Sequence, residues 1–280
     1  MIRQYLSLLK QNSLRAVLIR GVSSGIAVNA SGKLLFLAAQ VFLARILGVE
    51  QYGLFTYVIV WIDVLLLLSL FGMDTTLLRY VSQYYEQQEW GYLWGILKSS
   101  LLIVLVASTV IGLLAAVVIW WFQERLGTDL YFTFLIGLVS LPFLAMFQLR
   151  QSSLRALKLI VRANLPIAVF PSIIIIVGIA ILNLLFDQNI SSQMAMSLHV
   201  GAAIFSLLIG SFWLNQYLQR NSVQNKPHYQ LRGWMRVSIP LFLVSGTNLI
   251  LNQTDILMIG ALLSPNEVGI YWAAVKLSRL

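Results

Sequence analysis

The sequence is dominated by apolar segments that are long enough to cross a lipid bilayer. A membrane-spanning helix needs roughly 20 mostly apolar residues. Seven segments meet this requirement, at about residues 22–46, 54–72, 97–122, 130–149, 163–186, 194–218 and 238–260. The predicted fold class is therefore all-α, a polytopic transmembrane helix bundle.

Composition supports the membrane assignment. Hydrophobic residues make up 59% of the 280 and charged residues only 10%, whereas soluble domains have about 45–50% and about 25%. A soluble core cannot use so much apolar surface, so the excess must face lipid. The chain has no cysteine, which excludes disulfides, thiolate metal sites and thiol nucleophiles.

An eighth apolar segment begins near Val268 and ends at Leu280. Its 13 residues would extend only about 20 Å as a helix, whereas the hydrocarbon layer is about 30 Å thick. We therefore expect this chain to be a fragment that stops within its eighth helix.

Charge placement predicts the orientation in the membrane. With a cytoplasmic N-terminus, 14 Lys and Arg residues fall in the lead-in and inner connections and one, Arg125, falls outside. This is the positive-inside pattern, and it accounts for the net charge of +9 without nucleic acid as a partner. Residues 1–20 are interpreted as a cytoplasmic amphipathic lead-in, although a frayed basic tail fits them equally well.

Aromatic residues gather at the predicted ends of the spans, as expected for side chains with one apolar and one wet end. They are Trp90, Tyr92, Trp94, Trp120, Trp121, Trp213, Tyr217 and Trp234. We interpret them as interfacial belts; sugar stacking is the less favoured alternative.

A weak internal repeat suggests how the spans are grouped. Residues 47–55 (LGVEQYGLF) resemble residues 263–271 (LSPNEVGIY) at an offset of 216, although two short turns can also match by chance. Repeats around a central site are typical of transporters. The predicted organisation is a lead-in at 1–20, a six-helix lobe at 21–218, a basic inter-lobe linker at 219–237, and the start of a second lobe at 238–280, comprising helix 7 and a partial helix 8.

Polar residues within the spans fall on shared helix faces and near the bilayer centre. A charge at that depth costs about 2.5–3.5 kcal/mol, so it should face the bundle interior or a water-filled cavity. We predict a substrate cavity lined by Asn29, Lys33, Asp63, Asn248, Asn252, Lys276 and Arg279. In this hypothesis Lys33, Lys276 and Arg279 attract an anion. The alternative is structural: Lys33 pairs with Asp63, and the asparagines form interhelical hydrogen bonds.

Three other features have mainly structural interpretations. His199, alone in the sixth span, is interpreted as a packed histidine rather than a proton relay. Pro166 and Pro171 are expected to bend the fifth span. Asp255 is predicted to lie nearer the outer face.

Signatures of an enzyme are lacking in the sequence. The two histidines, His199 and His228, are far apart, and no phosphate-binding G-x-x-x-x-G-K-[ST] loop or G-x-S-x-G nucleophile motif occurs. The predicted outer loops are too short for a catalytic domain. The chain is therefore predicted to be no enzyme, without metal or cofactor.

Several motifs resemble one transporter family. The stretch 44–55 (ARILGVEQYGLF), the exit 70–81 (LFGMDTTLLRYV), and the pieces SIP at 238–240, NQTD at 252–255 and PNEVGIY at 265–271 occur in matching order. They resemble the polysaccharide transporter branch of the multidrug/oligosaccharidyl-lipid/polysaccharide exporter superfamily. Val49 stands where that family usually has proline. The resemblance covers residues 20–100 and 232–280 well, and hydropathy carries it between them.

This resemblance implies a flippase that moves undecaprenyl-diphosphate-linked oligosaccharide units across the bacterial inner membrane. It also implies two six-helix lobes around a central, often cationic, cavity. The implied partners are the lipid-linked oligosaccharide and membrane lipids, with a polysaccharide polymerase or glycosyltransferases as neighbours. The alternative is a cation-coupled drug or metabolite exporter of the same superfamily, with Asp63 or Asp255 as its ion-coupling carboxylate.

Overall fold

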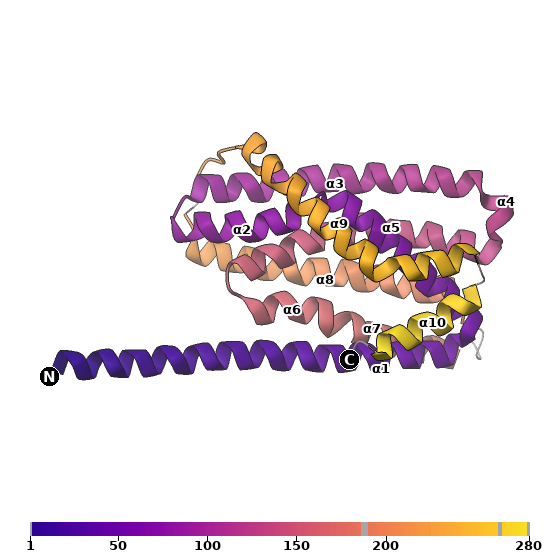
Figure 1. Ribbon diagram of the computed structural model, residues 1–280, viewed down its shortest axis with the longest axis horizontal. Helices are drawn as coiled ribbons and strands as arrows, with labels where there is room; N and C mark the ends of the chain where they lie inside the picture. Colours follow the sequence, from indigo (N-terminus) through magenta and orange to yellow (C-terminus); the bar gives the residue numbers. More distant parts are fainter. Residues whose placement is uncertain (1, 186–189, 224, 263–264, 279–280) are drawn as a thin grey trace.

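The structure is a computed structural model, and the part of the chain that it describes consists of helices joined by short connections (Figure 1). It describes the backbone of residues 2–185, 190–223, 225–262 and 265–278, and within these ranges it leaves out the side chains of residues 2–29, 168, 185, 261, 265–266, 273 and 276–278. The helices are α1 (Ile2–Leu70), α2 (Met73–Glu86), α3 (Trp90–Trp121), α4 (Gln123–Leu126), α5 (Thr128–Ala156), α6 (Ile160–Ala168), α7 (Phe170–Leu185), α8 (Ser192–Asn221), α9 (Leu231–Leu262) and α10 (Pro265–Ser278).

Six of the described helical stretches are long and apolar enough to cross a membrane. They are Ala30–Leu70, Trp90–Trp121, Thr128–Ala156, Ile160–Leu184, Ser192–Asn221 and Leu231–Gly260. The protein is thus an all-α, multi-pass helix bundle, and the predicted fold class is confirmed.

A sharp turn at Gly48 divides α1 into two helices that run back along each other (Figure 1). Gly48 has φ 72° and ψ 172°, a conformation that glycine adopts readily because it has no Cβ. A Cβ built there would meet no atom within 4 Å, so backbone conformation rather than space requires glycine. The connection between the predicted spans 22–46 and 54–72 is therefore a turn at Gly48, and the second helix of α1 starts directly after it.

The second half of α1 continues into α2 through another glycine. Gly72 has φ 74°, in the left-handed region, and α2 begins directly after it. Together the second half of α1 and α2 form one long, bent column, and Asp63 lies near its middle.

The predicted fifth span is divided between α6 and α7 at Val169. Pro166 and Pro171 stand on either side of this break. A proline ring removes one backbone donor and clashes with the preceding turn, which explains why the helix breaks here. The bend expected from these two prolines is present.

The helices differ sharply in how much they are covered. α5 packs against α8, α3, α1 and α2, and half of its most apolar window is buried; only 11% of the corresponding window of α3 is buried. Leu102, Leu113 and Leu114 of α3 are each more than 60% exposed. α5 is thus a central helix of the bundle, and α3 leaves a broad apolar surface exposed.

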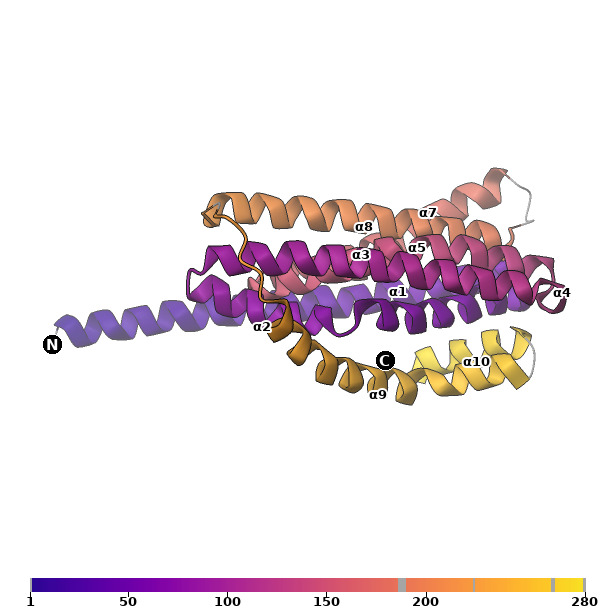
Figure 2. The same ribbon diagram turned by 90° about the horizontal axis from the view of Figure 1, so that it is seen from above.

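The helix connections separate into two ends of the bundle (Figures 1 and 2). One end carries the α2–α3 and α5–α6 connections and the segment that leads into α9, and the opposite end carries the Gly48 turn, α4, the last turn of α9 and the first turn of α10. The first, which we call the basic end, gathers Arg79, Arg155, Lys158, Arg162, Arg220, Lys226, Arg232 and Arg236. Arg125 lies in α4 at the opposite end.

Candidate functional site

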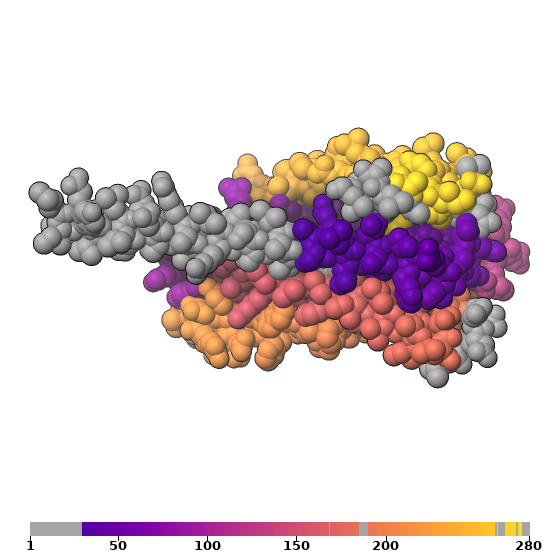
Figure 3. Space-filling model, turned by 90° about the horizontal axis from the view of Figure 1, so that it is seen from below, coloured from indigo at the N-terminus to yellow at the C-terminus, as the bar shows by residue number. Residues whose placement is uncertain are grey.

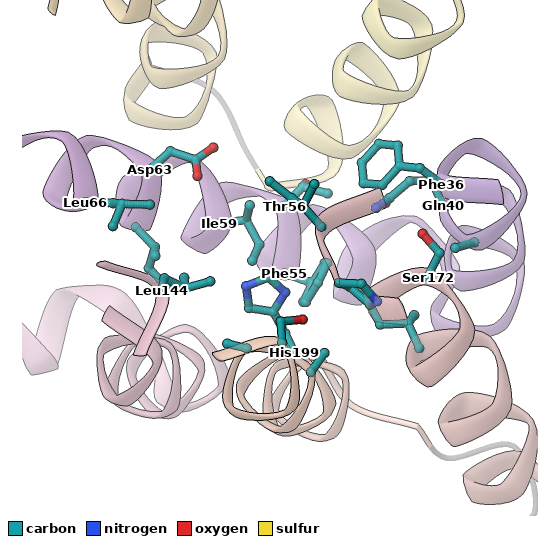
Figure 4. Close-up of a pocket in the computed structure, with 18 of the residues that line it drawn as sticks. Phe36, Gln40, Phe55, Thr56, Ile59, Asp63, Leu66, Leu144, Ser172 and His199 are labelled. Carbon is teal, nitrogen blue, oxygen red and sulfur yellow. The ribbon is translucent and has the colours of Figure 1, made fainter. Parts of the chain in front are cut away.

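A cavity of about 250 Å³ lies inside the bundle, between both halves of α1, α5, α6, α7 and α8, and α10 contributes one wall (Figure 4). Most of its lining is apolar. The polar side chains that reach it are Gln40, Thr56, Asp63, Gln148, Ser172, His199 and Ser206.

Asp63 is the carboxylate of this cavity, and it lies where α1 meets α9. Its Oδ2 atom accepts a hydrogen bond from Nε2 of Gln253 at 3.3 Å. Figure 4 shows Asp63 on α1 and His199 entering from α8 on the other side of the cavity. The carboxylate is half-buried, which is where an intramembrane charge is expected when it lines a polar cavity.

Other polar groups around the cavity are held in place by local hydrogen bonds. The Tyr52 hydroxyl donates to Oε1 of buried Gln40 at 3.1 Å, and the Thr56 hydroxyl donates to the Tyr52 carbonyl at 2.9 Å. On the far wall, the Ser206 hydroxyl donates to the Pro166 carbonyl at 2.7 Å. Such bonds fix the shape of the cavity because a buried polar group without a partner is costly.

Aromatic rings form much of the apolar wall. Trp272 of α10 lines the cavity and packs against Tyr52 and Phe36, with ring centroids 6.0 and 6.4 Å apart. His199 makes an edge-to-face contact with Phe55 at 6.3 Å. α10 lies in the region 238–280 that is predicted to begin a second lobe, so this region also contributes to the cavity wall.

The described side chains place the predicted site residues in different surroundings. Lys33 is exposed on the first half of α1, one helical turn from the cavity-lining Phe36, and it forms no ion pair with Asp63. Figure 3 shows this half of α1 at the surface, between α10 and α6–α7. Asn248 and Asn252 are exposed on α9, and the Asn252 side chain donates to the Asn248 carbonyl at 2.6 Å.

Asp255 is engaged within the second half of the chain. The Tyr271 hydroxyl donates to its Oδ2 atom at 2.8 Å, and its Oδ1 atom accepts from the Ile256 amide at 2.9 Å. Arg279 and the side chains of Asn29 and Lys276 lie outside the described residues. The shared cavity predicted for these residues therefore remains a prediction, in which Asp63 is the member that lines the cavity described here.

Sequence reasoning did not select several residues of this site, among them Gln40, His199, Gln253 and Trp272. Gln40 shares a helix face with Lys33, a spacing of seven residues that could have marked it. The residues from α8, α9 and α10 reach the site because helices that are distant in sequence pack together. The spacing of residues within one helix gives no information on such packing. Among the described residues, no group of three or more His, Asp and Glu side chains could hold a metal ion.

A family model described as "Polysaccharide biosynthesis protein" matches residues 18–280, nearly the whole chain. The chain belongs to the polysaccharide biosynthesis protein family. The resemblance of its motifs to the polysaccharide transporters is thereby confirmed. No curated protein and no solved structure matches the chain.

Proposed function

We propose that the protein flips undecaprenyl-diphosphate-linked oligosaccharide units across the bacterial inner membrane for surface polysaccharide synthesis. The observation that carries this proposal is the family match over residues 18–280 on a helix bundle with an internal cavity that several polar side chains reach. The protein acts as a transporter rather than an enzyme, and its reaction makes and breaks no covalent bond.

The distribution of charge supports a cytoplasmic N-terminus. The eight Lys and Arg side chains named for the basic end would then face the cytoplasm, and Arg125 of α4 would face outward, following the positive-inside rule. The lipid-linked substrate, which is made on the cytoplasmic side, would enter from the basic end.

The predicted cationic residues have a defined role in this proposal. The substrate carries a diphosphate, and Lys33 lies on the same face of α1 as Phe36 and Gln40, which line the cavity. An ammonium group beside the cavity would attract the diphosphate, with Lys276 and Arg279 proposed to add to the effect. Asp63 would then hold the two halves in register through Gln253.

Complementation of a bacterium that lacks its own flippase for lipid-linked units tests the proposal. We expect the protein to restore surface polysaccharide and Lys33→Ala to restore less of it. Lys98→Ala is the matched control, because Lys98 is an equally exposed lysine on α3, away from the cavity. Normal membrane insertion without any surface polysaccharide would contradict the proposal.

One observation favours the second candidate, a cation-coupled drug or metabolite exporter. Asp63 shares its cavity with the rings of Phe36, Phe55, Phe147 and Trp272, and aromatic faces beside a carboxylate suit a lipophilic cation. In the same cells this candidate predicts resistance to cationic drugs that is lost in Asp63→Asn, with no restored polysaccharide. Asp255 is the weaker coupling candidate because both of its oxygens have partners within the second half.

A further inference from the structure

The connection between α8 and α9 is seated on the first half of the bundle at the basic end. We call residues 225–230, which lead into α9, the strap. Figure 2 shows this connection crossing from the end of α8 to the start of α9 beside α2 and α3. The strap is therefore a docked segment, although the sequence here predicts only a basic linker.

Hydrogen bonds fix the strap and its approach to α3. The His228 amide donates to the Gly91 carbonyl at 2.9 Å, and the indole N–H of Trp94 donates to the Val223 carbonyl at 3.3 Å. The Tyr92 ring lies against the His228 ring, with centroids 5.5 Å apart. Main-chain and ring contacts together set the position of His228 on the first turns of α3.

Two glycines of α3 provide the seat for the strap. A Cβ built at Gly95 would lie 1.9 Å from the His228 carbonyl oxygen, and one built at Gly91 would lie 2.4 Å from the His228 ring. Real Cβ atoms do not approach backbone this closely, so any other residue at Gly95 must displace the strap. A Cβ built at Gly112, farther along the same helix, would lie 3.7 Å from the nearest side-chain atom of Leu141, so a methyl group fits there.

The first turns of α9 continue the same contact onto α2. Trp234 is fully buried, and its indole N–H donates to the Tyr84 hydroxyl at 3.0 Å. The Tyr84 ring is stacked between those of Tyr80 and Tyr92, with centroids 5.6 and 5.5 Å away. The contact continues through Ser238, whose hydroxyl donates to the Phe71 carbonyl, to Phe242, whose ring stacks on that of Phe71 with centroids 5.0 Å apart.

Past this region the middle of α9 is less covered. Leu243 and Val244 are 63% and 59% exposed, and α9, which contains Pro240, curves away from α2 and α3 (Figure 2). Nearer the opposite end there is a second set of contacts: Gln253 of α9 bonds to Asp63, and a Cβ built at Gly269 of α10 would lie 3.0 Å from the Val49 carbonyl. The contact at the basic end is thus a separate, short region, and it has no spare room. A contact of this kind is either docked or separated, because close-packed surfaces do not deform continuously.

We propose that the strap, together with the first turns of α9 up to Ser238, is the gate that closes the basic end of the protein. The docked arrangement seals the gap between α2 and α9, and separation of His228 from Gly95 and of Trp234 from Tyr84 opens it. The gate rests on the proposed transport function, since a transporter must admit its substrate from one side at a time.

Thiol labelling tests the gate without any substrate. The chain has no cysteine, so Ser238→Cys places one thiol under the docked contact, where Ser238 is fully buried. In membranes with the basic end accessible, we expect an impermeant maleimide to label it slowly. Adding Gly95→Ala should raise the labelling rate about tenfold, the change that loss of one well-made contact gives. Adding the matched Gly112→Ala should leave the rate unchanged.

A second variant tests the same contact independently, in case Gly95→Ala does not fold. Tyr84→Phe removes the acceptor of the Trp234 indole and keeps the ring stack, so it should also speed labelling. Tyr80→Phe is its control, because the Tyr80 ring is in the same stack but its hydroxyl makes no hydrogen bond to the described residues. Slow labelling in both Gly95→Ala and Tyr84→Phe would overturn the gate. So would equally fast labelling when Gly48→Ala is added instead, because this substitution strains the backbone away from the seat and the labelling would then report global unfolding. Neither outcome depends on substrate, so a failed complementation leaves this test standing.

Discussion

The cavity and the seat of the strap, which Gly91 and Gly95 of α3 provide, are both places where the segment after α8 meets the helices before it. They differ in how tightly they are packed. The cavity keeps about 250 Å³ free and places a carboxylate, an imidazole and two amides in a mostly apolar wall. The seat has no free space. At Gly95 the backbone of α3 lies directly against that of His228, and the buried Trp234 indole N–H donates to the Tyr84 hydroxyl. Incomplete packing is costly, so the space kept in the cavity suits the proposed substrate, and the full packing at the basic end suits the proposed gate.

The largest effect is expected from filling the cavity. Ala203 lines it on α8 and is buried, so Ala203→Phe should abolish polysaccharide export in the complementation assay and cost about 1–3 kcal/mol through overpacking. Gly201→Phe is the matched control on the same helix, because its Cβ direction is open. Equal export by the two variants would mean that the cavity holds no substrate.

The second prediction compares two glycines with positive φ in different backbone conformations. Gly72 has φ 74° and ψ 8°, in the left-handed helical region, and Gly48 has φ 72° and ψ 172°. A Cβ at Gly72 would lie 2.4 Å from the Ser238 carbonyl, and one at Gly48 would meet nothing. Gly48→Ala should cost about 1–3 kcal/mol from backbone strain alone, and Gly72→Ala should cost more than the left-handed strain of about 1–2 kcal/mol because α9 must also move. Thermal unfolding in detergent measures both, and a loss of no more than about 2 kcal/mol for Gly72→Ala would show that α9 is not tightly seated on Gly72.

The third prediction concerns the single hydrogen bond that ties α9 to α2. Tyr84→Phe leaves the buried indole of Trp234 without its acceptor, which should lower stability by about 1–3 kcal/mol. Tyr80→Phe should change stability far less. Matching unfolding curves for the two variants would remove this bond from the account of the seat.

The smallest effect is expected from alkaline pH. Burial raises the pKa of the Tyr84 phenol above its ordinary value of 10.0; the Trp234 hydrogen bond offsets part of this rise, and Tyr80, Glu89 and Tyr92 add to it. Because folding favours the neutral phenol, this stabilisation is complete below pH 10 and is lost as the pH rises through the raised pKa. The thermal midpoint of the wild type should therefore fall more between about pH 9 and about pH 11 than that of Tyr84→Phe. Parallel curves would contradict this assignment.

The sequence alone predicts the helical architecture well, because the backbone hydrogen bonds of each membrane span must be made within its own helix. Apolar length locates the spans, and Pro166 and Pro171 mark the break between α6 and α7. The exact helix ends are less predictable: α3 starts at Trp90, before the predicted residue 97, because interfacial aromatic residues continue the helix.

Contacts between distant helices are what the sequence does not predict. Trp234 is predicted to be an interfacial belt residue from its residue type and its position at the end of a span. The structure corrects this prediction: Trp234 is fully buried against α2, because of the way α9 packs there. The predicted linker at 219–237 is shorter in the structure, since α8 extends to Asn221 and α9 begins at Leu231. In the same way, equal depth suggests a Lys33–Asp63 pair, whereas the structure gives Gln253 as a partner of Asp63.

Translocation in proteoliposomes tests the central claim most directly. The protein is reconstituted with an undecaprenyl-diphosphate-linked oligosaccharide on the inner leaflet, and a sugar-cleaving enzyme outside reports its arrival on the outer leaflet. The account predicts faster cleavage with the wild type and with Gly201→Phe than with empty liposomes, and no acceleration with Ala203→Phe. Cleavage at the empty-liposome rate with folded wild-type protein would contradict it.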